Sequence, residues 1–366
     1  MRILAVVGGL SSVAGVMSSA IQTVILPRGA PSRIARVVFG FTRLLFQLRI
    51  RRRAPYHTRD RILALYAPVS LIMLLISWLG LTLLAFTAVF WGLHAPSLRD
   101  AFVESGSSLL TLGFARAPDL PATSMSFLEA GLGLILLAML ITYLPSMYAA
   151  FARREQLVAM MEVRAGSPPS AVEMFLRYHG IGWMDRLPDM WRRWEQWFVD
   201  IDESHVSFPA LSFFRSSQPG HSWVTAAGAV LDAAALSAST IDHAPDPDAE
   251  LCIRAGFLTL RRIAGFFGIP YDPDPRPDDP ISIRREEFDA VCEQLEAGGV
   301  PVRTDREKAW RDFAGWRVNY DKVLLGLAAI TMAPWAPWST DRVDMVVDEL
   351  PLARWQKERI VHSTRR

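Results

Sequence analysis

One stretch decides the fold of this chain: SLRDAFVESGSSLLTLGFARAPDLPATSMSFLEAGLGLILLAMLITYLPSMYAAF, residues 97–151. It begins with a short amphipathic segment from Ser97 to Leu110 and turns sharply at Thr-Leu-Gly-Phe, residues 111–114. A loop with prolines follows, and then one long apolar run from Ser126 to Phe151. A second long apolar run, from Leu63 to Leu93, precedes the stretch. A half-length helix and a glycine turn between two membrane-length runs indicate a re-entrant segment, which enters a membrane and leaves it on the same side.

Three apolar runs are long enough to cross a bilayer. The first, from Ile3 to Leu26, has about 24 residues without a charge, and a helix needs about 20 to cross the hydrocarbon core. The alternative for this run is a signal peptide cleaved near Ser18-Ser19-Ala20, but only Arg2 precedes it and the run is long for that purpose. Together with the two later runs, it predicts an all-α membrane protein with three transmembrane helices.

The distribution of arginine predicts the orientation. Ten arginines and a single acid, Asp60, lie within residues 28–61. Arg99 and Arg116 are the only basic residues within residues 95–123, and a basic end follows the last run. Because basic loops stay on the cytoplasmic side, we expect a multi-pass protein of the inner (plasma) membrane. Its N-terminus is expected outside and its C-terminal domain in the cytoplasm.

The basic loop contains a helical pattern of its own. Between Ile34 and Ile50, the polar side chains fall on one helical face and Val, Phe and Leu on the others. This pattern predicts a basic amphipathic helix on the inner leaflet, with Arg51, Arg52 and Arg53 at anionic lipid headgroups. The alternative is a helix packed against the spans, with its arginines solvated.

The chain after Ala165–Pro169 is more polar and is predicted to be a cytoplasmic helical domain, because no part of it alternates steadily between apolar and polar residues. Trp191, Trp194 and Trp197 form a stripe that predicts a core or a subunit face. The expected helices are Ala171–Asp200, Ser222–Ser239, Pro245–Gly268, Arg284–Ala297 and Asp305–Ile330, then a charged helix in the tail from Val343. The predicted domains are residues 1–62 (first span and interfacial helix), 63–155 (two spans around the re-entrant segment) and 156–366.

Composition and motifs argue against several functions. The net charge of +2 in 366 residues gives no indication of nucleic-acid binding. Cys252 and Cys292 form neither a disulfide framework nor a CxxC metal pair, and the histidines lack ligand spacing. The acidic, proline-rich loop Asp272–Asp279 is expected to be solvated rather than to bind a divalent cation. No paired carboxylates, Ser/His set or phosphate loop emerges, so we expect neither an enzyme nor a cofactor.

The glycine turn suggests a chemistry. An ion that crosses a membrane must exchange its water shell for other oxygens, and a ring of backbone carbonyls can supply them. With Ser107-Ser108-Leu109-Leu110-Thr111-Leu112-Gly113-Phe114 between two spans, the region from Leu63 to Arg154 resembles the pore domain of the two-span potassium channel family. The resemblance implies a homotetramer around one selectivity filter. It also implies that the permeant ion is K⁺ or another monovalent cation.

The resemblance assigns roles to individual residues, matched position by position to the family's Thr-Val-Gly-Tyr-Gly-Asp filter. The implied selectivity filter is Thr111, Leu112, Gly113, Phe114 and Ala115. The implied inner-helix hinge is Gly131 or Gly133, and the implied outer mouth contains Arg116, Asp119 and Glu104.

Two departures from the family pattern bear on selectivity. Ala115 replaces the second filter glycine, and a left-handed backbone there would cost about 1 kcal/mol or more. Arg116 replaces the acidic residue at the mouth, where four copies would repel cations unless Asp119 or Glu104 neutralised them. A potassium pore, a weakly selective cation pore and a non-conducting relative all stay open.

Two acidic residues in this region have alternative interpretations. Glu129, early in the third span, is either a functional intramembrane acid or a residue that faces water at the outer interface. Glu104 either pairs with Arg116 or Arg99 behind the filter or is solvated outside. The alternative to a channel is a membrane-anchored scaffold or interaction protein, in which the turn at Gly113 is an ordinary external loop. A membrane enzyme is a third and weaker hypothesis.

Overall fold

The computed structural model describes residues 1–26, 32–50, 56–352 and 357, and within these ranges every regular element is a helix. The all-α prediction is therefore confirmed. The chain forms two compact units. The first, called the apolar unit, comprises Met1–Ile50 and Leu65–Ala149, and the second, called the polar unit, comprises Arg51–Ala64 and Ala150–Arg366. The predicted division grouped residues 56–64 with the spans, whereas here they belong to the polar unit.

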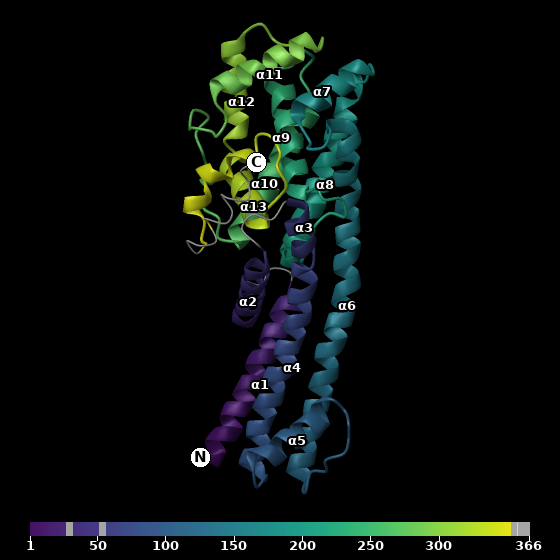
Figure 1. Cartoon of the computed structure of the whole chain (residues 1–366), viewed down its shortest axis with the longest axis vertical. Coiled ribbons are helices and arrows are strands. Elements are labelled where there is room, and N and C mark those ends of the chain that lie inside the picture. The colour runs from purple at the N-terminus through teal and green to yellow at the C-terminus, as the bar shows by residue number, and fades with distance from the viewer. Residues whose placement is uncertain (27–31, 51–55, 353–356, 358–366) are drawn as a thin grey trace. The chain divides into compact units, whose positions relative to one another are not determined.

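Long helices build the apolar unit (Figure 1): α1 (Arg2–Val24), α2 (Arg33–Arg49), α4 (Tyr66–Leu93), α5 (Leu98–Leu109) and the first part of α6 (Leu120–Ala165). α1 lies along α4, with Gly9 against the Ala85 carbonyl. Seven residues further along α4, Gly92 lies against the Arg2 carbonyl at the start of α1, so the two helices are antiparallel. A Cβ atom at either glycine would lie 2.6 Å from the facing oxygen, and this close packing therefore requires glycine.

Three stretches of the described residues are long and apolar enough to cross a membrane: Arg2–Val24, Tyr56–Leu93 and Leu120–Ala165. Large apolar side chains cover their outward sides, among them Leu84 and Ile141, each 60% exposed. Apolar surface on this scale favours hydrocarbon over water as the surrounding solvent. The chain therefore has the build of a membrane protein with three spanning helices, as the sequence predicts.

The predicted helix from Ile34 to Ile50 is present as α2. It begins after Ser32, whose hydroxyl accepts a hydrogen bond from the Ala35 amide at 3.1 Å. The helix packs on α4, yet Val37 and Leu48 remain 70% and 64% exposed. The arginines 51–53, predicted to contact lipid headgroups, lie outside the described residues.

The third apolar helix is longer than the sequence suggested. α6 runs past Phe151 to Ala165 and contains Pro145. It ends where Gly166 takes a φ of 81°, a backbone conformation that suits glycine. Arg154, part of the predicted basic end, is only 3% exposed, and its guanidinium donates to the carbonyls of Leu211 and Phe214, each at 2.8 Å. Residues 150–165 of α6 thus belong to the polar unit, and Val158, Met161 and Ala165 lie in its core.

The polar unit is a compact bundle of shorter helices. Its α-helices are α3 (Tyr56–Ala64), the end of α6, α7 (Ala171–Gly180), α8 (Leu187–Ser207), α9 (Trp223–Ser239), α10 (Pro247–Phe266), α11 (Arg285–Ala297), α12 (Arg306–Arg317) and α13 (Asp321–Thr331). Its short 3-10 helices are η1 (Met184–Arg186), η2 (Pro209–Phe213), η3 (Thr340–Met345) and η4 (Val347–Glu349).

The core of the polar unit surrounds α9, nearly all of whose residues are buried. Trp191, Trp194 and Trp197 are 0%, 1% and 4% exposed on α8, which packs against α10. The tryptophan stripe is therefore a core, one of the two predicted alternatives. Gly256 permits the close approach of α10, because a Cβ atom there would lie 2.5 Å from the Leu231 side chain.

Three predicted helices differ from the observed ones. The helix expected over 171–200 is interrupted after Gly180, because Gly182 adopts a φ of 71°. The helix expected over 305–330 is two helices, with a break between Arg317 and Asp321. In place of the charged helix expected from Val343, the tail up to Leu352 contains the short helices η3 and η4, and of the residues beyond it only Lys357, which is helical, is described.

Candidate functional site

The short helix α5 is held between α4 and α6 of the apolar unit. Ser97 caps its N-terminus by accepting from the Asp100 amide at 3.2 Å. Near the middle of α5, the Ser105 hydroxyl lies 3.0 Å from the Leu83 carbonyl of α4 and donates to the Glu129 carboxyl of α6 at 2.5 Å. One small residue thus joins three helices.

The C-terminus of α5 lies against α6 at Gly133, well past the first residue of α6 at Leu120. A Cβ atom at Gly133 would lie 2.7 Å from the Leu109 carbonyl, so glycine is required for this approach. No atom lies within 4 Å of the corresponding position at Gly131 in the described residues. α6 is helical through both glycines. For Gly133, predicted as a possible hinge, the structure therefore supplies a different reason for glycine, namely close packing.

The turn after α5 is held by Ser107. The Ser107 carbonyl accepts a hydrogen bond from the Leu112 amide at 2.8 Å, and its hydroxyl accepts one from the Ala115 amide at 3.0 Å. Gly113 has a φ of 73°, as expected for a glycine turn. Thr111, not Ala115, is the non-glycine residue of this turn in the left-handed region, with a φ of 54°. Such a conformation is unusual for a β-branched residue and costs of the order of 1–3 kcal/mol.

The two acidic residues of this region are both buried. Glu129 is 0% exposed and bonded to Ser105, so it does not face water as one alternative held. Glu104 is 7% exposed and pairs with His94 at 2.9 Å, rather than with Arg116 or Arg99. Each carboxyl has one oxygen without a partner among the described residues. Through their bonds to His94 and Ser105, Glu104 and Glu129 hold α5 against the segments on either side of it.

The residues predicted for the outer mouth do not form a neutral cluster. Arg116 is exposed and makes no ion pair within the described ranges. Glu104, its predicted partner, pairs with His94 instead. Asp119 caps α6, its carboxylate accepting from the Ala122 amide at 2.9 Å. Arg116, which the resemblance assigns to an outer mouth, therefore has no ion-pair partner among the described residues.

The predicted filter residues lie together on the surface of the single chain. Residues 111–114 are all exposed, with Leu112 at 59% and Phe114 at 64%. Two large apolar side chains beside a strained turn are unfavourable in water. Either an ordinary external loop or a face covered by further copies of the chain accounts for this exposure.

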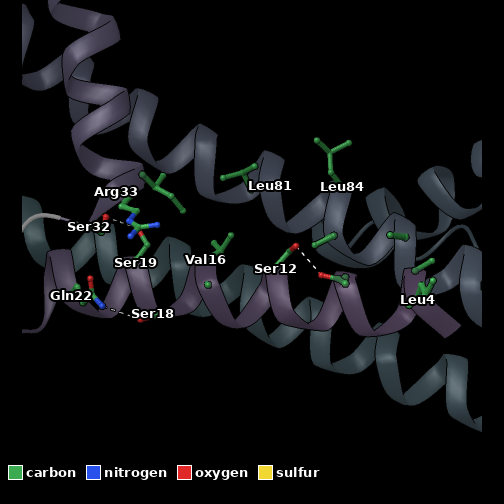
Figure 2. A pocket seen from close by; sticks show the side chains of 17 residues that line it. Leu4, Ser12, Val16, Ser18, Ser19, Gln22, Ser32, Arg33, Leu81 and Leu84 are labelled. Atoms are coloured by element: carbon green, nitrogen blue, oxygen red, sulfur yellow. Dashed lines mark hydrogen bonds between the residues drawn. The ribbon is translucent and has the colours of Figure 1, made fainter.

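A groove of about 750 Å³ runs along α1, α2 and α4 (Figure 2). Its polar side chains bond locally: Ser12 donates to the Gly8 carbonyl at 2.8 Å, and Gln22 donates to Ser18 at 3.0 Å. Val16, Leu81 and Leu84 line the rest with apolar surface. Arg33 also lines the groove, which is open and otherwise mainly apolar. A single arginine on an open surface does not define a binding site, so the turn after α5 is the better candidate site.

Sequence reasoning missed Ser105 and His94, which hold α5, and gave no structural role to Ser107, which holds the turn. The available signal was the presence of serines in a helix predicted to pack within a membrane, where each hydroxyl needs a partner. The described residues contain no group of three side chains suited to a metal ion. Comparisons with family models, curated proteins and solved structures find no match to this chain.

Proposed function

We propose that this chain is the subunit of a homotetrameric pore-loop cation channel in the inner (plasma) membrane. The observation that carries the proposal is the path of α5, which runs back along α4 and ends against Gly133, with the turn at residues 111–115 clamped by Ser107. In this proposal the N-terminus of the chain lies outside the cell and the polar unit lies in the cytoplasm, as the arginine distribution indicates.

The depth of the turn supports a pore loop. Leu83, which faces Ser105, lies ten residues before the end of α4 at Leu93. At 1.5 Å per residue this corresponds to about 15 Å, roughly half of a hydrocarbon core of about 30 Å. Non-helical backbone at that depth is tolerated only where protein buries it or where it lines a water-filled path. Residues 111–114 are exposed in a single chain, and contact with other copies around a central water-filled path explains this exposure best.

The chemistry of the loop fits cation transfer. Carbonyls of the turn, with the Thr111 hydroxyl, offer the oxygens that replace the water around a monovalent cation. One loop per chain requires several copies around an axis, and the resemblance to two-span channels gives four. The exposed Arg116 disfavours cations at the mouth, so we expect K⁺ or another monovalent cation at low throughput rather than a highly conductive pore.

The remaining parts have supporting roles in this proposal. The exposed apolar face of α2, with its arginines, suits the inner leaflet and anionic lipids. Arg154 anchors α6 in the polar unit through the carbonyls of Leu211 and Phe214. Movement within the polar unit would therefore act on the same helix that lines the pore, which makes this unit the place where a gating signal enters.

Flux through reconstituted protein tests the proposal. We expect K⁺ efflux from proteoliposomes of the wild type and its loss in Gly113→Val, because valine cannot readily adopt a φ of 73°. Gly80→Val is the matched control, since Gly80 lies in α4 with open space around it, and it should keep the flux. Absence of cation flux in a protein that is not tetrameric would reject the channel. That outcome would leave the membrane-anchored scaffold as the better account.

A further inference from the structure

A cavity of about 430 Å³ lies wholly within the polar unit, among the loop after α6 and helices α7, α9 and α11. This volume is in the range of sites for small molecules. The residues used below line it: Ser170, Asp232, Val291, Gln294 and Trp338.

Asp232 gives the cavity an incompletely paired carboxylate. The residue is only 3% exposed. Its Oδ1 accepts hydrogen bonds from the guanidinium of Arg317 and from the hydroxyl of Tyr320, the latter at 3.0 Å. Its Oδ2 accepts none from any described residue. A polar atom on a residue this buried is normally paired, so its environment has room for a donor.

The charges around Asp232 do not balance. Arg317 also donates to Asp321 at 2.7 Å, and the other hydrogen bonds of Asp321 come from the amide and hydroxyl of Ser282, each at 2.7 Å. One buried guanidinium therefore faces two buried carboxylates. Burial raises the pKa of the Asp232 carboxyl, while the charge of Arg317 opposes that rise. The unmatched negative charge is costly unless a proton or a cation joins Oδ2.

The wall of the cavity suits an organic cation. Trp338 lines it in a left-handed backbone conformation, with a φ of 57°, and its carbonyl accepts from Arg317 at 2.6 Å. Strain of this kind in an aromatic residue marks a position that the surroundings fix. Aromatic faces attract cations. The positive charge of Arg177, at the same cavity, is matched by Glu173 at 2.7 Å.

We propose that this cavity binds a small organic ammonium or amidinium ion with an aromatic body. Its N–H group donates to Asp232 Oδ2, and its ring lies beside Trp338. Binding by itself does not depend on the channel function.

A regulatory consequence follows only if the proposed function holds. The cavity is lined by residues 166–170, which directly follow α6. Arg177 caps the end of α6 by donating to the carbonyls of Glu162 and Val163 at 2.9 and 2.7 Å. A bound ligand therefore contacts the segment that ends the pore-lining helix and stabilises one arrangement of it.

Matched ligand pairs test the binding without any measurement of ion flux. Phenethylamine against 2-phenylethanol, benzamidine against benzamide, and tryptamine against tryptophol are titrated into the full-length protein in detergent, with saturation-transfer NMR as the readout. We expect saturable binding of at least one cation, about tenfold or more tighter than its neutral partner, because a buried carboxylate strongly prefers a charged donor.

Two neighbouring substitutions locate the site. Gln294 and Glu293 are adjacent exposed residues of α11, of which only Gln294 lines the cavity. Gln294→Trp should abolish the binding, whereas Glu293→Trp should leave it unchanged. Failure of all three cations to bind, equal affinity within every pair, or binding that survives Gln294→Trp would overturn the proposal. A channel without such binding would reject the site alone, and binding by a protein that shows no flux and is not tetrameric would reject the channel alone.

Discussion

The two units of this chain differ in how many of their large apolar side chains they leave exposed. The apolar unit leaves Ile76, Leu84 and Ile141 between 54% and 60% exposed, whereas the polar unit buries Trp191 and Phe198 completely. Because exposed apolar surface on this scale is more stable against hydrocarbon than against water, the first unit is compatible with a membrane environment. The polar unit, in contrast, buries most of its large apolar side chains in one core.

The difference also extends to buried polar groups. In the apolar unit one group of them lies around α5, where Glu104 pairs with His94 and Ser105 contacts the Leu83 carbonyl of α4 and Glu129 of α6. In the polar unit the strongest cluster surrounds Arg317, between Asp232 and Asp321. Buried polar groups are costly unless paired, so each cluster marks a position where geometry matters more than hydrophobicity. One cluster supports the turn, and the other borders a cavity.

The largest expected effect comes from breaking the cluster of the polar unit. Arg317→Met leaves two buried carboxylates without their cation and should lower the free energy of unfolding by about 3–5 kcal/mol. Chemical denaturation of the full chain in detergent, followed by tryptophan fluorescence, measures this change. Arg262→Met is the control, because its pair with Asp202 is exposed and should cost less than about 1 kcal/mol. Equal effects of the two substitutions would show that the buried cluster is not a stabilising centre.

The packing of α5 in the apolar unit is tested at Gly133, which lies against the Leu109 carbonyl. Gly133→Ala places a Cβ atom 2.7 Å from the Leu109 carbonyl and should displace α5 at a cost of about 1–3 kcal/mol. Hydrogen exchange of the amides in residues 105–109 should then accelerate by about tenfold or more. Gly131→Ala, two residues away with open space, should leave the exchange unchanged. Similar exchange in both variants would mean that α5 does not rest on Gly133.

A pH dependence is expected from the polar unit. His205 is buried, its Nδ1 lies 3.1 Å from the Ile201 carbonyl and its Nε2 lies 3.3 Å from the Arg154 guanidinium. Burial and then the charge of Arg154 hold the pKa of His205 well below its usual value of 6.5. Because the unfolded chain takes up the proton first, stability is full above about pH 6.5 and falls below it, by up to about 1.4 kcal/mol per pH unit.

Thermal unfolding between pH 7.5 and 5.0 measures this dependence. His205→Gln removes the titrating group and should flatten the slope below pH 6.5. If the wild type and His205→Gln lost stability in parallel over this range, the dependence would arise elsewhere.

The smallest effect is expected at the turn itself. Ser107→Ala removes the hydroxyl that accepts from the Ala115 amide and should cost about 1 kcal/mol locally. The exchange of the Ala115 amide should rise about fivefold, whereas Ser108→Ala, one residue along, should not change it. Unchanged exchange in Ser107→Ala would mean that the backbone bonds alone hold the turn.

The sequence predicted helix boundaries well where polar residues repeat with helical spacing. α2 was predicted within one residue at each end from the repeat of its polar side chains on one helical face, and the structure adds the cap at Ser32. The long helix α6 was predicted too short, since a change from apolar to charged residues at Arg153 ends a hydrophobic run but not a helix. The break at Gly182 was missed because a glycine within a helical pattern ends a helix only when its neighbours permit a positive φ.

The position of the turn after α5 was predicted, but the contacts that hold it were not. The turn at Thr111–Phe114 follows from the glycine and its position after a short helix. The partners of Glu104 and Glu129 do not follow from the sequence, since His94 and Ser105 become their neighbours only when α4, α5 and α6 pack together. The bond between Arg317 and Asp232 joins residues of α12 and α9 that are far apart in the sequence. Such pairings depend on tertiary packing, which periodicity and composition do not encode.

The most direct test of the central claim is a cryo-electron microscopy structure of the full chain in lipid nanodiscs. The pore-loop account predicts four copies around one axis, with the Thr111 residues converging on it and the Leu112 and Phe114 side chains covered by neighbouring copies. A monomer or dimer, or a ring in which residues 111–114 face away from the axis, would contradict it.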